Sequence, residues 1–205
     1  MMLEKLIVFV EEYSMEAALE WLLPKLLGDI EFQIIRFQCK DDLLKKSPDR
    51  LRGYASWLPA NWRILVLVDR DDDDCVALKA ELESMAAAAG LLTKTAVGQE
   101  RAFQVVNRIA IEELEAWFFG DWSAVKAAYP RVAATISQKV GFRDPDAIAG
   151  GTWEALERVM MKAGYFSTGL RKLECARTVA QHMEPHRNTS RSFHAFTGAV
   201  TASLA

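Results

Sequence analysis

Three short apolar segments of the chain each run directly into a group of carboxylates, and this pattern restricts the possible folds more than any other feature. The segments are residues 6–10, 63–68 and 103–111. Their length and their content of Ile, Val, Leu and Phe are typical of strands that are buried on both faces of a parallel sheet. Helical patterns lie between them, so we expect strands and helices to alternate, with the strands parallel to one another.

The rest of the sequence completes the predicted fold. In the first half we also expect a helix that starts near Ser14 and ends at Gly28, a strand at 30–37, a short helix after Pro48, a helix at 75–89 and a strand at 91–97. In the second half we expect only helices, at 120–130, 152–163 and 170–183 and after a capping residue, Ser190. These patterns predict an α/β fold, with a mostly parallel sheet flanked by helices in residues 1–120 and a helical C-terminal extension, 121–205, packed on that core.

Composition narrows the class of protein. Hydrophobic residues make up 51% of the 205 residues, which excludes a disordered chain. No apolar run approaches the roughly 20 residues of a membrane span, and the N-terminus lacks the features of a signal peptide, so we expect no membrane association. Three widely spaced cysteines argue against a disulfide framework or a cysteine zinc site and favour the cytoplasm. The net charge of −3 argues against a general nucleic-acid coat but allows a local basic groove.

Acidic residues follow all three apolar segments at the point where each predicted strand ends. They are Glu11 and Glu12, Asp69 and Asp71, and Glu112, Glu113 and Glu115. Because ligands bind outside the carboxyl ends of parallel strands, we expect these residues to line one edge of the sheet. Crowded carboxylates repel one another, and a hard divalent cation with oxygen ligands, best Mg²⁺, would neutralise them. Such an ion positions and polarises phosphates, and a pair of ions can hold both the attacking and the leaving oxygen.

Two of the acidic groups also have a structural interpretation. Residues 71–74 are compatible with a solvated turn whose carboxylates interact favourably with the N-terminus of the following helix. Residues 112–115 are equally compatible with the exposed face of an amphipathic helix around Leu114, Trp117 and Phe118. The spacing alone leaves metal binding and these structural roles open.

Two motifs resemble the Toprim domains of the overcoming-lysogenization-defect type of nuclease. Residues 10–16 (VEEYSME) are similar to the V-E-G-x-[ST]-x-E signature that opens these domains, and residues 67–71 (LVDRD) are similar to their D-x-D motif. Further strings, among them E-L-E-A-W at 113–117 and S-F-x-x-F at 192–196, are similar to domain of unknown function family 4276, a Toprim-like bacterial family. This similarity covers most of the chain.

The resemblance implies a Toprim fold and Mg²⁺-dependent hydrolysis of phosphodiester bonds in DNA or RNA, with Mn²⁺ as an alternative ion. It assigns Asp69 and Asp71 to one ion, and Glu11 either to the same ion or to deprotonation of the attacking water. The family has a glycine after this glutamate, where the present chain has Glu12. A glutamate adds size and negative charge at a position where glycine allows a tight turn near phosphate.

Two further sets of residues complete the mechanism that we expect. Glu115, together with Glu113, would hold a second ion. Toprim nucleases use a lysine to stabilise the negative charge that develops during the reaction, and Lys162 and Lys172 are both candidates for this role.

The resemblance also implies partners. Toprim-like proteins of this kind act with an ATPase of the AAA or ABC type in phage defence or mobile-element biology, so we expect nucleic acid and such an ATPase as partners. A non-catalytic accessory module that binds the ATPase through the helical extension is the alternative, which Glu12 favours. A phosphoacceptor domain that uses Asp69 or Asp71 is a third hypothesis.

A basic segment with aromatic residues extends over residues 40–57. Its lysines and arginines, with Tyr54 and Trp57, are suited to contact a phosphate backbone. The aspartates in the same segment indicate a mixed exposed helix equally well, and this alternative also stays open.

Overall fold

Parallel strands form a single four-stranded sheet in the computed structural model, which describes residues 2–98 and 102–205. The strands, in the order β2-β1-β3-β4 across the sheet, are β1 (Lys5–Val10), β2 (Glu31–Arg36), β3 (Trp62–Asp69) and β4 (Val105–Ala110). The central strands β1 and β3 are buried almost throughout, as their continuous apolar sequences require. The predicted α/β class with a parallel sheet is confirmed.

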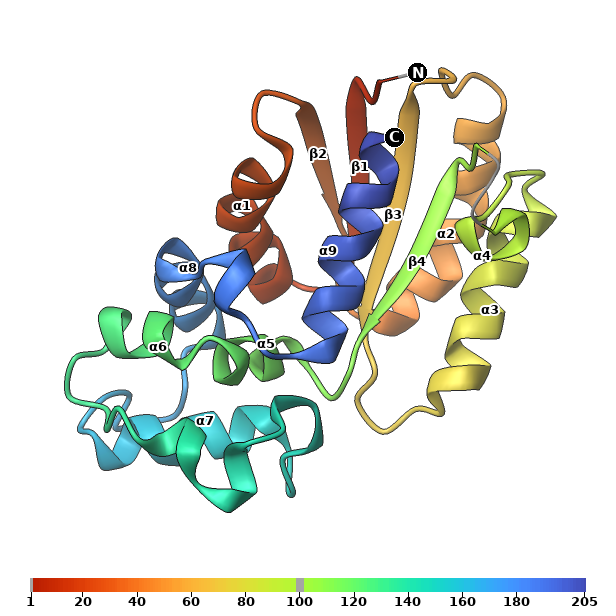
Figure 1. Cartoon of the computed structure of the whole chain (residues 1–205). Helices are drawn as coiled ribbons and strands as arrows, with labels where there is room; N and C mark the ends of the chain where they lie inside the picture. Colours follow the sequence, from red (N-terminus) through yellow and green to blue (C-terminus); the bar gives the residue numbers. More distant parts are fainter. Residues whose placement is uncertain (1, 99–101) are drawn as a thin grey trace.

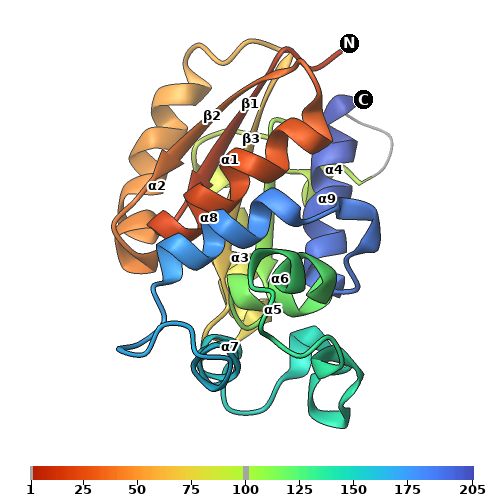
Figure 2. The same ribbon diagram turned by 90° about the vertical axis from the view of Figure 1, so that its left-hand side faces the viewer.

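Helices cover both faces of this sheet and extend beyond its carboxyl edge (Figure 1). The α-helices are α1 (Tyr13–Leu27), α2 (Lys40–Ala55), α3 (Cys75–Ala88), α4 (Lys94–Val97), α5 (Leu114–Gly120), α6 (Trp122–Ala128), α7 (Thr152–Lys162), α8 (Lys172–His182) and α9 (Arg191–Leu204). Short 3₁₀ turns occupy Ile136–Gln138, Val140–Phe142, Pro145–Ala147 and Pro185–Arg187. The helices α1, α8 and α9 lie on one face of the sheet, and α2 and α3 lie on the other (Figures 1 and 2).

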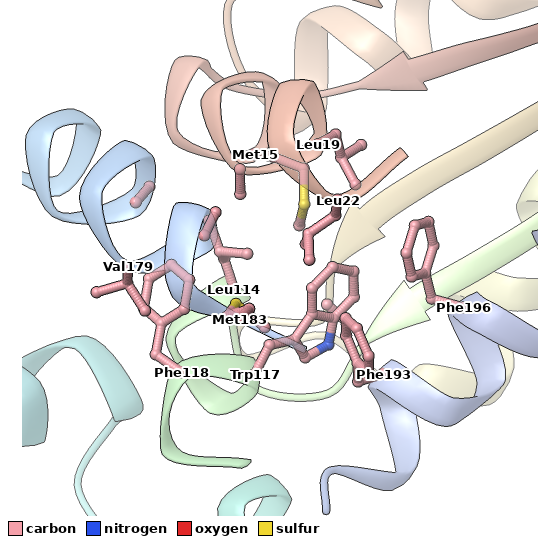
Figure 3. Packing of buried hydrophobic residues seen from close by; sticks show 14 of the residues in the cluster. Met15, Leu19, Leu22, Leu114, Trp117, Phe118, Val179, Met183, Phe193 and Phe196 are labelled. Carbon is pink, nitrogen blue, oxygen red and sulfur yellow. The ribbon is translucent and has the colours of Figure 1, made fainter. Parts of the chain in front are cut away.

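Alternate residues of the central strands enter two separate hydrophobic cores, because successive side chains of a strand point to opposite faces. On one face, Val8 and Leu65 belong to a core that includes α1, α5, α8 and α9. On the other face, Phe9 and Val66 belong to a smaller core with α2 and α3. In the larger core, Trp117 of α5 lies among side chains of α1 and α9 (Figure 3).

The second half of the chain contains the predicted helices, and they contribute to the larger core. Ser190 caps α9 as predicted, since its hydroxyl accepts a hydrogen bond of 3.1 Å from the N–H of Phe193. Helix α8 packs along α1, and α9 packs against β4. The division of the chain at residue 120 into a core and an extension stays a prediction.

Two local predictions are wrong. The segment 91–97 is not a strand: Thr93 makes one isolated bridge to Val105 and then caps the short helix α4 through a hydrogen bond from the N–H of Ala96. The helix expected after Pro48 begins at Lys40, eight residues before the proline, and continues through it. Proline removes one helical hydrogen bond, and the burial of this helix against the sheet offsets that loss.

All four strands end at the same edge of the sheet, because they are parallel. Helix α5 follows β4 directly at this edge, and α7 lies farther out (Figure 1). The acidic residues that the sequence singled out for chemistry lie at or near this edge.

Candidate functional site

The carboxyl ends of β1 and β3 place Glu11 and Asp69 beside each other in the middle of the sheet. Asp69 is the last residue of β3, and Glu11 directly follows Val10, which is in register with Leu67. Oε1 of Glu11 accepts a hydrogen bond of 2.6 Å from the backbone N–H of Asp69. Glu11 is 5% exposed and Asp69 is 4% exposed. The parallel sheet therefore joins two predicted site residues from separate motifs.

The carboxylate of Asp69 is the least satisfied group of this site. Its Oδ1 atom is buried and has no hydrogen-bond partner within residues 2–98 and 102–205. Burial raises the pKa of Asp69 well above its usual range, and the negative charges of Glu11 and Glu115 raise it further. Burial also raises the pKa of Glu11 to about 7, although the hydrogen bond from Asp69 opposes this shift. A cation beside these carboxylates would lower the cost of burying their charge.

Asp71 lies in an exposed turn and already has a cationic partner. Its φ of 49° is in the left-handed region, and its N–H donates to the carbonyl of Glu112 at 2.9 Å, which joins the loops after β3 and β4. Its carboxylate lies 2.7 Å from Nζ of Lys40, which also lies 2.7 Å from the carboxylate of Asp73. Burial acts to lower the pKa of Lys40, but the hydrogen bonds with Asp71 and Asp73 outweigh it and raise this pKa.

Glu113 and Glu115 lie at the start of α5 in two different environments. Oε2 of Glu113 accepts hydrogen bonds of 3.0 Å from Oγ1 of Thr152 and from the N–H of Trp153, so it joins α5 to α7. Glu115 is 2% exposed. Burial raises the pKa of Glu115 to about 7, with an opposing effect from the charge of Lys172.

The structure tests the structural interpretation of each acidic turn. All of α5 is buried, so the interpretation of residues 112–115 as an exposed helical face is wrong. Residues 72–74 are exposed, and Asp74 caps α3 by accepting a hydrogen bond of 2.8 Å from the N–H of Ala77. The solvated-turn interpretation therefore holds for these three aspartates.

Of the two candidate lysines, Lys172 lies at the site and Lys162 does not. Nζ of Lys172 is 3.8 Å from Oε1 of Glu113 and 5.0 Å from the ring centre of Trp153. Burial acts to lower the pKa of Lys172, but the charges of Glu115 and Glu113 outweigh it and raise this pKa. Lys162 is an exposed residue at the end of α7.

A strongly acidic cavity of about 400 Å³ opens at this edge of the sheet. The predicted residues that line it are Glu11, Glu12, Asp69, Asp71, Glu113 and Lys172. Glu115 does not line it, although its charge raises the pKa of the cavity residue Asp69. Four of the five predicted metal ligands thus line one cavity, and the fifth, Glu115, is buried and does not line it.

Glu12 occupies the position of the glycine in the Toprim signature. Its backbone is extended, with φ −144° and ψ 170°, a conformation that any residue adopts. Its carboxylate accepts a hydrogen bond from Oγ of Ser14, and its side chain lines the cavity. Any effect of Glu12 on a ligand therefore comes from size and charge and not from a strained turn.

The cavity meets the requirements of a magnesium ion in its donor atoms but not in their present arrangement. Within residues 2–98 and 102–205, no group of three or more His, Cys, Asp or Glu side chains is already arranged to hold a metal ion. Asp71 and Glu113 are instead engaged by Lys40 and by α7. The donor chemistry still fits, because carboxylate oxygens are the ligands that Mg²⁺ prefers. The unpartnered Oδ1 of Asp69 is the specific feature that suits a cation.

The sequence did not predict the role of Lys40 in this cavity. We assigned this residue to the basic segment 40–57, but it is the first residue of α2, directly after the loop that follows β2. The rule that predicted the acidic residues, position at the carboxyl end of a strand, also applies to this loop.

Comparison with known proteins identifies a family for this chain. The family model described as Domain of unknown function (DUF4276) matches residues 10–201. No curated protein and no solved structure matches the chain. Within the part of the chain that the structure describes, no helix is both long enough and apolar enough to cross a membrane.

Proposed function

The chain belongs to the DUF4276 family, and we propose that it is a Mg²⁺-dependent, Toprim-like nuclease that hydrolyses phosphodiester bonds of DNA or RNA. The observation that carries this proposal is the buried, unpartnered carboxylate oxygen of Asp69, next to Glu11 in an acidic cavity. The resemblance of residues 10–16 and 67–71 to Toprim motifs supports the same assignment, because these segments supply both residues.

In this proposal, Asp69 and Asp71 hold the ion, and Glu11 either completes its ligand set or accepts the proton of the attacking water. Bound Mg²⁺ supplies polarisation of the phosphate and neutralisation of its charge. Hydrolysis joins the water oxygen to phosphorus and breaks the bond from phosphorus to the departing sugar oxygen. Lys172 offers a positive charge toward the phosphate as negative charge develops on it.

Glu113 and Glu115 are proposed as ligands of a second ion. Glu113 lines the cavity, whereas Glu115 lies behind it. Two ions would require Glu113 to exchange its hydrogen bonds with α7 for a metal, so the first ion is the stronger part of the proposal.

The ion pair between Lys40 and Asp71 favours a second candidate function, a non-catalytic accessory module. A metal ion at Asp71 competes with the ammonium of Lys40, 2.7 Å away, and Glu12 adds a further carboxylate to the cavity. In this alternative, the C-terminal helices bind an ATPase of the AAA or ABC type and the cavity holds no catalytic ion. The nuclease proposal includes the same partner, on the evidence of sequence resemblance.

A nicking assay tests the nuclease. Supercoiled plasmid and single-stranded oligonucleotides of DNA and RNA are incubated with the purified protein and Mg²⁺ or Mn²⁺. We expect cleavage that stops on addition of EDTA and that falls by about 100-fold or more in Asp69→Asn and in Glu11→Gln. Glu81→Gln, an exposed residue of α3, is the matched control and should cleave like the parent. Cleavage that survives both site substitutions contradicts the proposal.

Thermal unfolding gives a readout that does not depend on activity. An ion that binds only the folded protein stabilises it, and the stabilisation increases with the ratio of the ion concentration to its dissociation constant. We expect Mn²⁺ to raise the melting temperature of the parent protein and of Glu81→Gln but not of Asp69→Asn. An equal shift in all three proteins contradicts a site at Asp69, and no shift in any of them favours the accessory module.

A further inference from the structure

A second polar cavity, of about 480 Å³, adjoins the acidic one, and its lining is basic and aromatic. Gln38 lines both cavities. The remaining lining residues are Tyr13, Arg36, Phe37, Asp42, Lys46 and Arg50. Three cations thus face one carboxylate here, whereas carboxylates dominate the neighbouring cavity. We name this second cavity the basic cleft.

The cations of the basic cleft come from two elements. Lys46 and Arg50 are one helical turn apart on α2, in the basic segment that the sequence predicts to suit a phosphate backbone. The carboxylate of Asp42 lies 2.6 Å from Nζ of Lys46. Arg50 has no carboxylate partner within 4.0 Å in the described residues 2–98 and 102–205, and its guanidinium lies 5.5 Å from the ring centre of Phe37. Arg50 therefore supplies an uncompensated positive charge.

Tyr13 adds an exposed aromatic surface to the basic cleft. It is the first residue of α1 and is 56% exposed. The guanidinium of Arg36 lies 3.4 Å from the centre of its ring, and an ion pair of 2.9 Å with Glu16 holds this guanidinium in place. The ring is thus fixed and still open to a ligand.

The backbone connects the basic cleft to the acidic cavity over a short path. Arg36 ends β2 in register with Val10, the residue that directly precedes Glu11. The N–H of Phe37 donates to the carbonyl of Val10 at 2.9 Å. A ligand that occupies the basic cleft therefore lies beside the predicted catalytic residues.

We infer that the basic cleft binds a single strand of nucleic acid, with a phosphate at Lys46 and Arg50 and an unstacked base against Tyr13. This inference rests on the proposed function, because it assigns the cleft to the part of the strand next to the phosphate in the acidic cavity. A positive groove with an exposed aromatic ring is the usual combination for single-strand binding. In a duplex the bases are stacked on each other, so the ring of Tyr13 favours a single strand.

Fluorescence anisotropy in EDTA tests binding without hydrolysis. The probes are a labelled single strand of about 12 nucleotides, in DNA and RNA versions, and the corresponding duplex. We expect the single strand to bind more tightly than the duplex, with an affinity that falls as salt rises. Arg50→Glu and Lys46→Glu should each weaken single-strand binding by about tenfold or more. Arg158→Glu, an exposed arginine of α7 outside the cleft, should bind like the parent.

A second pair of variants tests the aromatic contact. Tyr13→Ala should weaken single-strand binding by about tenfold, the usual effect of losing one stacked base. Trp21→Ala is the matched control, because Trp21 is an exposed aromatic residue of the same helix, α1, but lies outside the cleft. Circular dichroism confirms that each variant is folded.

The outcomes separate this inference from the proposed nuclease. Asp69→Asn should abolish hydrolysis and keep single-strand binding in EDTA. Binding that depends on Arg50 and Tyr13 in a protein without nuclease activity supports the cleft and contradicts the nuclease. Equal binding by the parent, Arg50→Glu and Tyr13→Ala overturns the cleft, as does a duplex that binds as tightly as the single strand.

Discussion

The two faces of the sheet are covered in different ways. On one face, α2 and α3 come from the first half of the chain and lie next to the strands that they connect. On the other face, α1 and α5 pack with α8 and α9, which lie far along the chain. This second cover, through α5 and α8, also holds Glu113, Glu115 and Lys172 near the acidic cavity. The position of these three site residues therefore depends on packing between distant parts of the chain, whereas the packing of α2 and α3 on the other face is local.

Contacts from the last quarter of the chain fix α5. Nε1 of Trp117 donates to Oγ of Ser192 at 3.0 Å, and the carbonyl of Trp117 accepts a hydrogen bond of 2.8 Å from Asn188. Gly120 ends this helix where the backbone of residues 188–190 passes closely. A Cβ at Gly120 would collide with the side chain of Asn188 and lie 3.0 Å from the backbone nitrogen of Ser190. Only glycine allows this close approach.

Substitution of Trp117 should produce the largest difference between the two faces. Trp117 is fully buried, with ring centres 5.1 Å from Phe193 and 4.9 Å from Phe196. Trp117→Ala should lower the free energy of unfolding by about 3–5 kcal/mol, because it leaves a large cavity. Leu51→Ala, on the α2–α3 face, should cost about 3 kcal/mol. Urea denaturation measures both values.

Hydrogen exchange then shows whether the two covers are independent. In Trp117→Ala, amides of α5 and α9 should exchange faster, and those of α2 and α3 should keep the protection of the parent. Leu51→Ala should give the opposite pattern. Faster exchange on both faces in both variants would contradict the comparison. Trp117→Phe, which loses the hydrogen bond to Ser192 but keeps an aromatic ring, serves if the alanine variant does not fold.

The buried acid of the second cover should make stability depend on pH. The pKa of Glu115 is about 7 in the folded protein, against 4.5 for an ordinary glutamate. Below pH 4.5 the carboxyl is protonated in both states and contributes no penalty. As the pH rises from 4.5 through about 7, the unfolded chain releases its proton first, so the free energy of unfolding falls. Above pH 7 the loss is complete and amounts to roughly 3 kcal/mol.

Glu115→Gln should remove this loss, because the amide stays neutral. In EDTA, the variant should be more stable than the parent by roughly 3 kcal/mol at pH 8 and nearly equal to it at pH 4.5. Glu81→Gln, on the exposed surface of α3, should match the parent at both values. A Glu115→Gln variant with no advantage at pH 8 would show that the carboxylate is well solvated or paired.

The sequence predicts individual strands and helices better than it predicts the packing between elements that are distant in the chain. Apolar runs predicted three of the strands and the alternation of apolar residues predicted β2, while residues such as Gly28 and Ser190 predicted the ends of helices. The prediction of a strand at 91–97 failed. The apolar content of this segment is typical of a strand, but the cap supplied by Thr93 makes residues 94–97 helical. The interpretation of residues 112–115 as an exposed face failed because tertiary packing, including that of the distant helices α1, α8 and α9, covers α5, and periodicity does not reveal such contacts.

The same limit applies to the candidate site. The meeting of Glu11 and Asp69 follows from the rule that parallel strands end at one edge, so the sequence was sufficient to predict it. The pairing of Asp71 with Lys40 depends on the conformations of two loops, one after β2 and one after β3. No periodic pattern in the sequence specifies such a contact.

The helix caps of the two covers should show the smallest difference. Ser190 is buried, accepts a hydrogen bond from the N–H of Phe193 and donates one of 2.8 Å to Asp146. Asp74 is exposed and accepts one from the N–H of Ala77 at the start of α3.

Asp74→Ala should therefore cost about 1 kcal/mol, the usual value of a cap. Ser190→Ala should cost about 2 kcal/mol, because it also removes a buried hydrogen bond. For a chain of this length, thermal unfolding should show a decrease of about 2–4 °C for each kcal/mol. Equal decreases in the two variants would mean that the long-range cover depends on its caps no more than the local cover does.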